Sequence, residues 1–434
     1  MRDDTFFEPE IETMPRAAIE RLQEQRLMEL LPRAYERGGL VRETWDAAGI
    51  HPRDIRSLAD YRERAPFIDK DAVRRYRDTK GDPFGGILLV DERELDFIAT
   101  SSGTTGDATF FPEVWQEHVW APYLLSSARD FWHIGLRPGG YYMPGANSFK
   151  GPQVSGQLCG GIPLIVYQWF GGWPEIIEAI RRYSPTFVQM IGPMMIELAQ
   201  MAHQVDLHEL FRHVPAITFA GEPLGVKMKR KVAEWGPELY MWNSAGDCGV
   251  SYECRMHDGY HIWEDNVLVE CVDPDGRAAR ADGEIGELVT TGIDTGWVAP
   301  LIRYRTEDLV RISREPCGCG RTHVRFWPLG RKGDETLVGG RRVMLMDVWA
   351  AVEEVPETEN ALFQMVRPKK ELERLRLRVG YDTDITTNPD AVRDRLAQVI
   401  AARVGVEPEI ELMTEKALLE RGSIGSKFQR VAKQ

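Results

Sequence analysis

Short apolar runs alternate with amphipathic stretches from about residue 85 to about residue 310. The runs GILLV, PLIVY, TFVQMIG and AITFAGEP are typical of buried strands, because each is short and almost wholly apolar. The stretches GWPEIIEAIRRY and PMMIELAQMAHQV carry apolar residues at helical spacing. This alternation predicts an α/β domain with a largely parallel sheet and helices packed against it.

The pattern changes on both sides of this core. Residues 16–80 predict helices joined by polar connections, with Pro32 near a break in the first helix. The stretch 261–292 has turn signals at 273–276 and 282–283 between β-like runs, and it predicts a smaller antiparallel sheet.

The last hundred residues predict a unit of their own. ERLRLRVGYD alternates apolar and polar residues as a strand does, PDAVRDRLAQVIAARVGV has one apolar helical face, and EIELM reads as a further strand. We therefore expect a large N-terminal domain over residues 1–329 and a small α/β domain over residues 330–434.

Composition narrows the classes of partner. The chain has 434 residues, 43% of them hydrophobic, and its 54 basic and 67 acidic residues give a net charge of −13. That balance argues against general binding to nucleic acid or to an anionic membrane. The acidic N-terminus has no apolar core of a signal peptide, and no run approaches the ~18 apolar residues of a membrane helix, so we expect a cytoplasmic protein.

A loop rich in glycine and hydroxyl groups, TSSGTTGD, is the first candidate for chemistry. It is not a P-loop, since it lacks the GxxxxGK[ST] pattern. Its glycines permit tight turns, and exposed N–H groups beside hydroxyls can hold an anion. A Ser/Thr-rich surface turn is the alternative interpretation. The candidate residues are Ser101, Ser102, Gly103, Thr104, Thr105 and Gly106.

A second candidate is a set of cysteines and histidines in two segments, ECRMHDGYHIWED and EPCGCGRTH. Cys-Gly-Cys can wrap two thiolates around one ion, and Zn²⁺ prefers tetrahedral sulfur and nitrogen ligands. The alternative is a group of reduced, buried thiols. The set comprises Cys254, His257, His261, Cys317, Cys319 and His323.

Six motifs in order resemble the adenylate-forming acyl ligases, and within them the phenylacetate–CoA ligase group, from about residue 35 to the end. They are the Pro-Phe-x-x-Lys element ending at Lys70, the phosphate loop SSGTTG, the nucleotide-side turn AGEP, the ribose motif YRTEDLV, the hinge GRKGDETLVGGRRV and the C-terminal GSKFQRV. The resemblance implies a large adenylate-forming domain, with parallel sheets, helices and a smaller β subdomain, and a small mobile C-terminal α/β domain.

The resemblance also implies a two-step reaction. A carboxylate attacks the α-phosphate of ATP, usually with Mg²⁺, to give acyl-AMP and pyrophosphate, and a thiol, usually that of coenzyme A, then takes the acyl group. Lys427 would reach the α-phosphate and the acyl carboxylate, Asp308 would accept hydrogen bonds from the ribose hydroxyls, Arg331 would lie near the ribose or phosphate, and Asp334 would be the hinge. The turn Gly221, Glu222 and Pro223 would lie near the nucleotide.

The sequence departs from the group's pattern in two places. Asp107 stands where the phosphate loop usually has lysine, and Gly246 stands where a glutamate usually helps to hold Mg²⁺. Asp247 would supply that carboxylate with a shift of one residue, or it is a turn residue before Gly249. Trp242 would flank the adenine, with Asn243 beside it.

The resemblance selects a ligand set and an acyl pocket. The implied structural zinc site is formed by Cys254, His261, Cys317 and Cys319, and the aromatic side chains of Tyr141, Tyr142 and Phe149 would form a flat slot for an aromatic acid. We therefore expect AMP-forming activation of an aryl or arylalkyl carboxylic acid, most often to its CoA thioester. Transfer to an amine or a carrier-protein thiol, a binding module without turnover, and a homodimer are alternatives left open.

Overall fold

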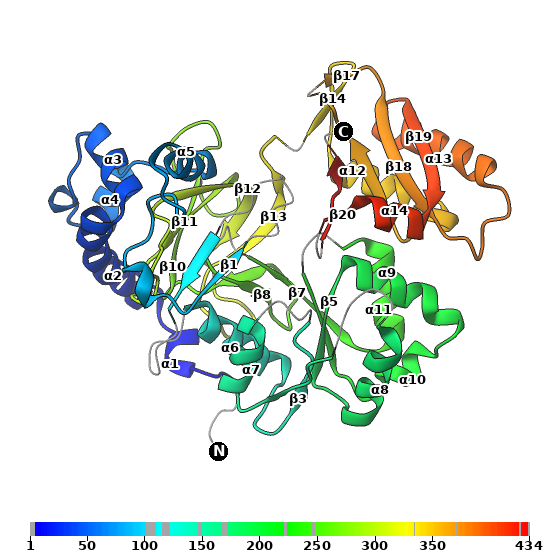
Figure 1. The fold of residues 1–434 in the computed structure, drawn as a ribbon, viewed down its shortest axis with the longest axis horizontal. Helices are drawn as coiled ribbons and strands as arrows, with labels where there is room; N and C mark the ends of the chain where they lie inside the picture. Colours follow the sequence, from blue (N-terminus) through cyan, green and yellow to red (C-terminus); the bar gives the residue numbers. More distant parts are fainter. Residues whose placement is uncertain are drawn as a thin grey trace.

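The computed structural model describes residues 5–100, 110–114, 122–145, 150–166, 172–220, 224–244, 248–333, 335–369, 371–424 and 427–432. One nine-stranded mixed sheet forms the centre of the large part of the molecule (Figure 1). Its strand order is β10-β11-β12-β13-β9-β8-β7-β6-β5. The small part follows β13 and lies above the end of the sheet that carries β5 to β7.

The parallel end of the sheet matches the expected α/β alternation. It consists of β5 (Phe187–Ile191), β6 (Ala216–Ala220) and β7 (Glu238–Asn243), joined through α8 (Trp173–Tyr183), α9 (Gly192–Gln200), α10 (Leu207–Phe211) and α11 (Val226–Trp235). β5 and β6 are buried along almost their whole length, as parallel strands covered on both faces are.

The other end of the sheet is antiparallel. It consists of β8 (Ser251–Glu253), β9 (Tyr260–Ile262), β13 (Arg325–Arg331), β12 (Tyr304–Ser313), β11 (Ile285–Gly292) and β10 (Val267–Val272). These strands do not form the separate small sheet that the sequence predicted. They continue the parallel end, because β7 pairs with β8 in the antiparallel sense.

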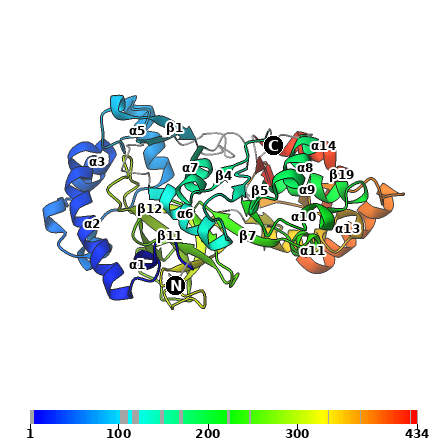
Figure 2. The same cartoon turned by 90° about the horizontal axis from the view of Figure 1, so that it is seen from below.

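The N-terminal helices cover the β10–β12 end of this sheet. They are α2 (Arg16–Arg37), α3 (Gly39–Ala47), α4 (Leu58–Arg64) and α5 (Lys70–Lys80). Leu27 and Trp45 share one core cluster with Leu268 of β10. Figure 2 shows α2 and α3 at the opposite end of the molecule from α8 to α11.

Three local predictions were wrong. GILLV is a loop: Gly86 takes a φ of +75°, and the Leu89 N–H donates to the carbonyl of Val298, which lies outside any strand. Pro32 does not break α2, since the helix runs on to Arg37 and the ring lies on its exposed face. Among the described residues of PLIVY, only the first, Pro163, lies in a strand, the short β4 (Ile162–Pro163), which pairs with β3 (Tyr141–Tyr142).

Among its described residues the small part has two larger sheets and the two-stranded sheet of β20 (Ser423–Ile424) and β21 (Lys427–Phe428). β15 (Arg341–Val343), β14 (Thr336–Val338) and β17 (Glu371–Leu372) form one, and β19 (Pro408–Thr414), β18 (Leu375–Tyr381), β16 (Phe363–Val366) and β22 (Val431–Ala432) form the other. The helices are α12 (Leu345–Val352), α13 (Pro389–Val404) and α14 (Glu415–Gly422). β18, α13 and β19 confirm the elements expected for this region.

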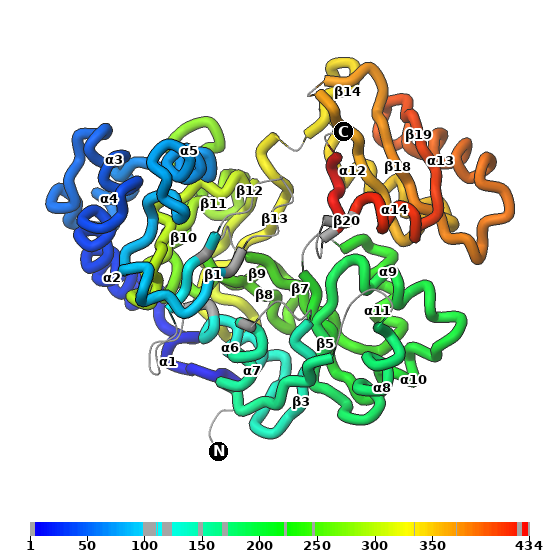
Figure 3. Tube along the Cα trace, in the orientation of Figure 1, coloured from blue at the N-terminus to red at the C-terminus, as the bar shows by residue number. Residues whose placement is uncertain are grey.

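The trace leaves the large sheet through β13 and enters the small part at β14 (Figure 3). The predicted boundary at residues 329 and 330 therefore falls inside β13, a few residues before the crossing. In the described part of the chain, no helix has the length and apolar character needed to cross a membrane.

Candidate functional site

Asp308 and Arg331 face each other on neighbouring strands of the large sheet. They are register partners in the β12–β13 ladder, and Arg331 Nε donates a hydrogen bond of 3.1 Å to Asp308 Oδ1. Arg331 Nη2 also donates to the carbonyl of Thr306 at 3.0 Å. The carboxylate is 29% exposed, so it is partly fixed by the protein and partly open to a ligand.

An irregular backbone sets the direction of Asp308. Glu307, the residue before it, has φ of +65°, which is unusual for a side chain of this kind. The Glu307 N–H donates to Glu287 Oε1 at 3.2 Å, and the Asp308 N–H donates to Thr306 Oγ1 at 3.0 Å. Such irregularities re-aim a side chain at the edge of a site.

The predicted adenine contact lies at the end of β7. Trp242 is half-buried and stacks on Tyr252 of β8, with ring centroids 5.7 Å apart and planes 18° apart. One face of the indole is therefore covered by protein, and only the other can meet a base. Asn243 follows it, and its carbonyl accepts a hydrogen bond from Ser251 Oγ.

Several predicted residues lie outside the described residues. They are Ser101, Ser102, Gly103, Thr104, Thr105, Gly106, Phe149, Gly221, Glu222, Pro223, Asp247 and Asp334. Their neighbours are described: β1 (Phe97–Thr100) ends where the glycine-rich loop begins, and β2 (Phe110–Glu113) pairs with it in antiparallel register. Lys427 is the first residue of the short strand β21 (Lys427–Phe428). Its register partner is Ile424.

The backbone on both sides of Asp334 is held from the small part. Arg367 Nη1 donates to the carbonyls of Gly333 and Glu335 at 2.8 and 2.9 Å. Sequence reasoning did not select Arg367, and no motif marks it, because its partners are backbone atoms more than thirty residues away.

The aromatic slot is only partly compatible with the packing. Tyr142 has no exposed surface, and its ring lies against Phe187 at a centroid distance of 5.5 Å, which is the environment of a core residue. Tyr141 is half-buried and its ring lies 5.2 Å from that of Tyr183.

The structure brings Cys254, His261, Cys317 and Cys319 together. One donor atom from each lies within 4.8 Å of all the others, and all four residues are buried. The Cys254 and Cys317 sulfurs are 3.6 Å apart, as are Cys319 Sγ and His261 Nε2. Ligands bound tetrahedrally to zinc at ~2.0–2.3 Å are separated by roughly this distance. Thus two segments far apart in sequence form one donor set of the expected kind.

The protonation states suit metal ligation. Burial lowers the pKa of His261, which keeps the imidazole neutral. The contact between Cys254 and Cys319 lowers the pKa of the Cys319 thiol and raises that of the Cys254 thiol, so Cys319 is the first of the two to ionise. A neutral imidazole and a thiolate are the forms that bind zinc.

The two histidines that were not selected have other partners. His257 lies 2.9 Å from Glu238 Oε1 on the surface. His323 is buried, accepts from the Glu264 N–H at 2.9 Å, and contacts the Ile11 carbonyl through Nε2 at 2.9 Å.

The N-terminal segment packs directly on the loop that carries Cys317 and Cys319. The buried Glu12 carboxylate accepts hydrogen bonds from Arg321 Nε and Nη2 at 3.0 and 2.9 Å. Thr322 Oγ1 donates to the Met14 carbonyl at 2.6 Å. The loop therefore joins the strands of the sheet to the first described residues of the chain.

Polar contacts join the small part to α9 and α11. Glu415 accepts hydrogen bonds from Gln200 Nε2 at 2.5 Å and from Asn360 Nδ2 at 3.0 Å, and Asn360 Oδ1 accepts from Lys231 Nζ at 2.8 Å. Burial raises the pKa of Glu415. These residues carry no short motif, and sequence reasoning missed them.

The Asp308→Asn substitution is expected to raise the KM for ATP by about 10- to 100-fold. Hydrogen bonds to a charged acceptor are worth about 1.5–3 kcal/mol, and the amide keeps the size of the side chain while removing its charge. Pyrophosphate release at varied ATP concentration measures the effect. Asp282→Asn is the control, since that carboxylate also pairs with an arginine, Arg314, at a surface turn. An unchanged KM in Asp308→Asn would remove Asp308 from the nucleotide site.

The chain is similar in sequence to ligases of known activity. No family model matches the chain. The chain is 30% identical over 450 residues to a phenylacetate–coenzyme A ligase of Thermus thermophilus, covering 94% of this chain and 95% of that one. It is 26% identical over 434 residues to a phenylacetate–coenzyme A ligase of Aromatoleum evansii, covering 96% and 94%.

Among solved structures, 2-hydroxyisobutyryl-CoA ligase in its postadenylation state, in complex with R3-HIB-AMP, has the same fold. The TM-score is 0.85 at 21% identity, over 100% of this chain and 93% of that one. In its thioesterification state, with 2-HIB-AMP and CoA, the TM-score is 0.70 at 23% identity, over 99% and 93%.

The fold is that of the 2-hydroxyisobutyryl-CoA ligase, and the 30% identity to the Thermus thermophilus enzyme makes the chain an adenylate-forming acyl ligase. Nearly the whole chain aligns with the Thermus thermophilus enzyme. The chain belongs to the phenylacetate–coenzyme A ligase family and is an AMP-forming acid–CoA ligase.

Proposed function

We propose that the enzyme activates an aromatic carboxylic acid, of the aryl or arylalkyl class, and transfers it to coenzyme A. The observation that carries this proposal is the 30% identity to a phenylacetate–coenzyme A ligase over 94% of the chain. The half-buried ring of Tyr141 is consistent with an aromatic wall, whereas the packing of Tyr142 removes that residue from the proposed slot.

The described residues support the nucleotide end of the reaction. Asp308 is partly exposed and held by Arg331, and its carboxylate is an acceptor-only group of the kind that binds ribose hydroxyls. Trp242 offers one ring face for adenine. We assign to Lys427 the positive charge that meets the α-phosphate, and to Asp247 the carboxylate beside Mg²⁺. Mg²⁺, bound with ATP, would reduce the repulsion between the phosphates and the incoming carboxylate.

We also propose that the four-residue donor set holds a structural zinc ion. Its three sulfurs and one imidazole nitrogen have the chemistry that Zn²⁺ prefers, and four protein ligands leave no open position for catalysis. The role of this ion is to join the β8–β9 turn to the loop before β13.

The proposed specificity is tested with a panel of acids. We expect ATP-dependent pyrophosphate release with phenylacetate or benzoate at a kcat/KM at least tenfold above that with 2-hydroxyisobutyrate or octanoate. We expect a thioester only when CoA is present. Faster turnover of the aliphatic acids would refute aromatic specificity. Release that needs no CoA and yields no thioester would favour an amine or carrier-protein acceptor.

A further inference from the structure

The small part of the molecule places a carboxylate against the start of α11. Glu353, the residue after α12, is almost fully buried, and the indole N–H of Trp349 donates to its Oε1 at 3.1 Å. Burial raises the pKa of Glu353, while this indole and the backbone N–H groups of Lys227 and Val226 act against the rise. Glu353 therefore lies close to the first turn of a helix that belongs to the large part.

The sequence of α11 leaves its first N–H groups without a cap. Gly225 precedes the helix and has no side chain to cap it, and the first turn holds no acidic residue. The first four N–H groups of a helix lack partners within the helix, and negative charge near them is stabilising. Glu353 thus supplies, from the other part of the molecule, the carboxylate that α11 lacks.

Gly225 gives the room that this contact needs. A Cβ at residue 225 would lie 2.5 Å from Trp349 Nε1 and would collide with Glu353 Oε1. The three atoms nearest to that Cβ all belong to the small part. The backbone angles of Gly225, φ −68° and ψ 160°, are open to any residue. A side chain at this position would therefore oppose the contact between the two parts without straining the backbone of the large part.

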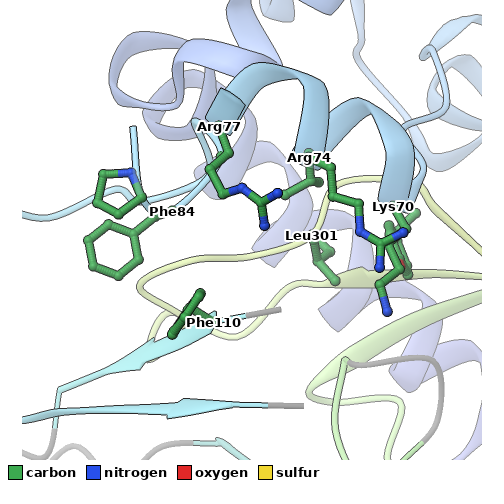
Figure 4. A pocket seen from close by; sticks show the side chains of 10 residues that line it. Lys70, Arg74, Arg77, Phe84, Phe110 and Leu301 are labelled. Atoms are coloured by element: carbon green, nitrogen blue, oxygen red, sulfur yellow. The ribbon is translucent and has the colours of Figure 1, made fainter. Parts of the chain in front are cut away.

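Basic side chains on two helices of the large part differ in what they face. Arg74 and Arg77 of α5 line a cavity of about 20 Å³ (Figure 4), which has room for a single water molecule. On α11, Lys227 Nζ and Lys231 Nζ lie 3.3 and 2.9 Å from carboxylate oxygens of Glu359, in the small part. These ion pairs join α11 to the small part in addition to the carboxylate at the start of the helix.

The seated small part also holds the end of the chain that carries Lys427. Phe428, the next residue, is 5% exposed and belongs to the hydrophobic core cluster that contains Met195 of α9. Glu415, the first residue of α14, accepts a hydrogen bond from Gln200 of α9. Contact with α9 and α11 therefore fixes the position of the backbone at Lys427.

We propose that Glu353 and Glu359 form a latch on α11 that positions Lys427 for the adenylation step. This proposal rests on the proposed function for the role of Lys427 in that step. The two glutamates act through the position of the small part, so they are positioning residues. In this assignment thioester formation does not use Lys427, and it therefore does not need the latch.

The first test is Gly225→Ala, which adds the Cβ that the latch excludes. We expect kcat for pyrophosphate release with phenylacetate and ATP to fall about 10- to 100-fold, as small misplacements of a reacting group do. The KM for ATP should change less than about twofold, because Asp308 and Trp242 lie in the large part. Thioester formation from preformed phenylacetyl-adenylate and CoA should stay close to wild type. Gly276→Ala is the control, since the atom nearest to a Cβ there lies 3.5 Å away.

The second test is Glu359→Gln, which removes the ion pairs without adding bulk. We expect kcat for pyrophosphate release to fall about threefold, since the pairs are partly exposed. Glu357→Gln is the matched control: it removes the same charge from the same segment, but Glu357 pairs with Arg395 of α13 inside the small part. This control should leave both steps unchanged.

Amide hydrogen exchange gives a readout that needs no turnover. The N–H groups of Val226 and Lys227 should exchange at least about threefold faster in Gly225→Ala and in Glu353→Gln than in wild type, because they lose the carboxylate that covers them. The last turn of α11 should exchange as in wild type and is the internal control.

Three outcomes overturn the proposal. They are unchanged pyrophosphate release in Gly225→Ala, an equal loss of both steps in that variant, and unchanged exchange of the first α11 amides. Melting temperatures verify folding, and if Gly225→Ala does not fold, wild-type pyrophosphate release in Glu359→Gln overturns the proposal instead. If the acid panel gives no pyrophosphate in wild type, the proposed function fails, while amide exchange still decides whether the latch forms.

Discussion

Replacing Lys427 with alanine is expected to lower acid-dependent pyrophosphate release by at least about 100-fold. The first step brings a carboxylate and a polyphosphate together, so a cation in the site stabilises the transition state more than the ground state. Removal of a single preorganised group of this kind costs about 10²–10³ in kcat. The measurement is pyrophosphate release under saturating acid and ATP.

A second assay separates this role from a loss of structure. The variant is given a preformed acyl-adenylate with CoA, and we expect thioester formation to stay within a few-fold of wild type, because the lysine belongs to the first step. Lys416→Ala, which removes an exposed lysine from α14 in the same part of the molecule, is the control and should keep both activities. Unchanged pyrophosphate release in Lys427→Ala would refute the assignment.

Replacing Cys319 with serine is expected to abolish zinc binding and to lower the melting temperature by about 5 °C. The variant loses one of the four donors of the proposed zinc site, and the free energy of binding a structural metal is part of the free energy of folding. Metal analysis and thermal unfolding give the two readouts, and strong chelators should reproduce the loss of stability in the wild-type protein.

The control for this prediction is Cys159→Ser. That thiol is also buried but donates to the Ala128 carbonyl and lies outside the donor set, so the variant should keep about one equivalent of zinc. Less than about half an equivalent in wild-type protein purified without chelators would count against the zinc site.

The regular elements could be predicted because their periods are strong. β18 alternates apolar and polar residues, α13 buries Val392, Leu396 and Ile400 on one face, and both were expected from the sequence. GILLV failed because its apolar side chains are buried without strand pairing: Ile87 and Leu89 pack in core clusters formed by helices and strands, while the Leu89 N–H donates to the Val298 carbonyl. The residues of GILLV are therefore apolar because they are buried, and not because they pair with a neighbouring strand.

Site residues that belong to a sequence motif were predicted. Site residues whose role depends on tertiary contacts were missed. The Cys-Gly-Cys pair pointed to metal ligation, and the resemblance selected the four donors that the structure brings together. Nothing in the sequence shows that Glu307 takes a positive φ beside Asp308, or that Arg367 holds the backbone around residue 334. Both depend on partners that only tertiary structure supplies.

The contact between the N-terminal segment and the loop that carries Cys317 and Cys319 has a consequence for the order of folding. Glu12 and Arg321 are separated by 309 residues, and both are almost completely buried. Contacts of such long range form late, because a large loop must be closed before they gain anything. During synthesis, Glu12 therefore stays exposed to water until the loop with Arg321, which buries it, has left the ribosome.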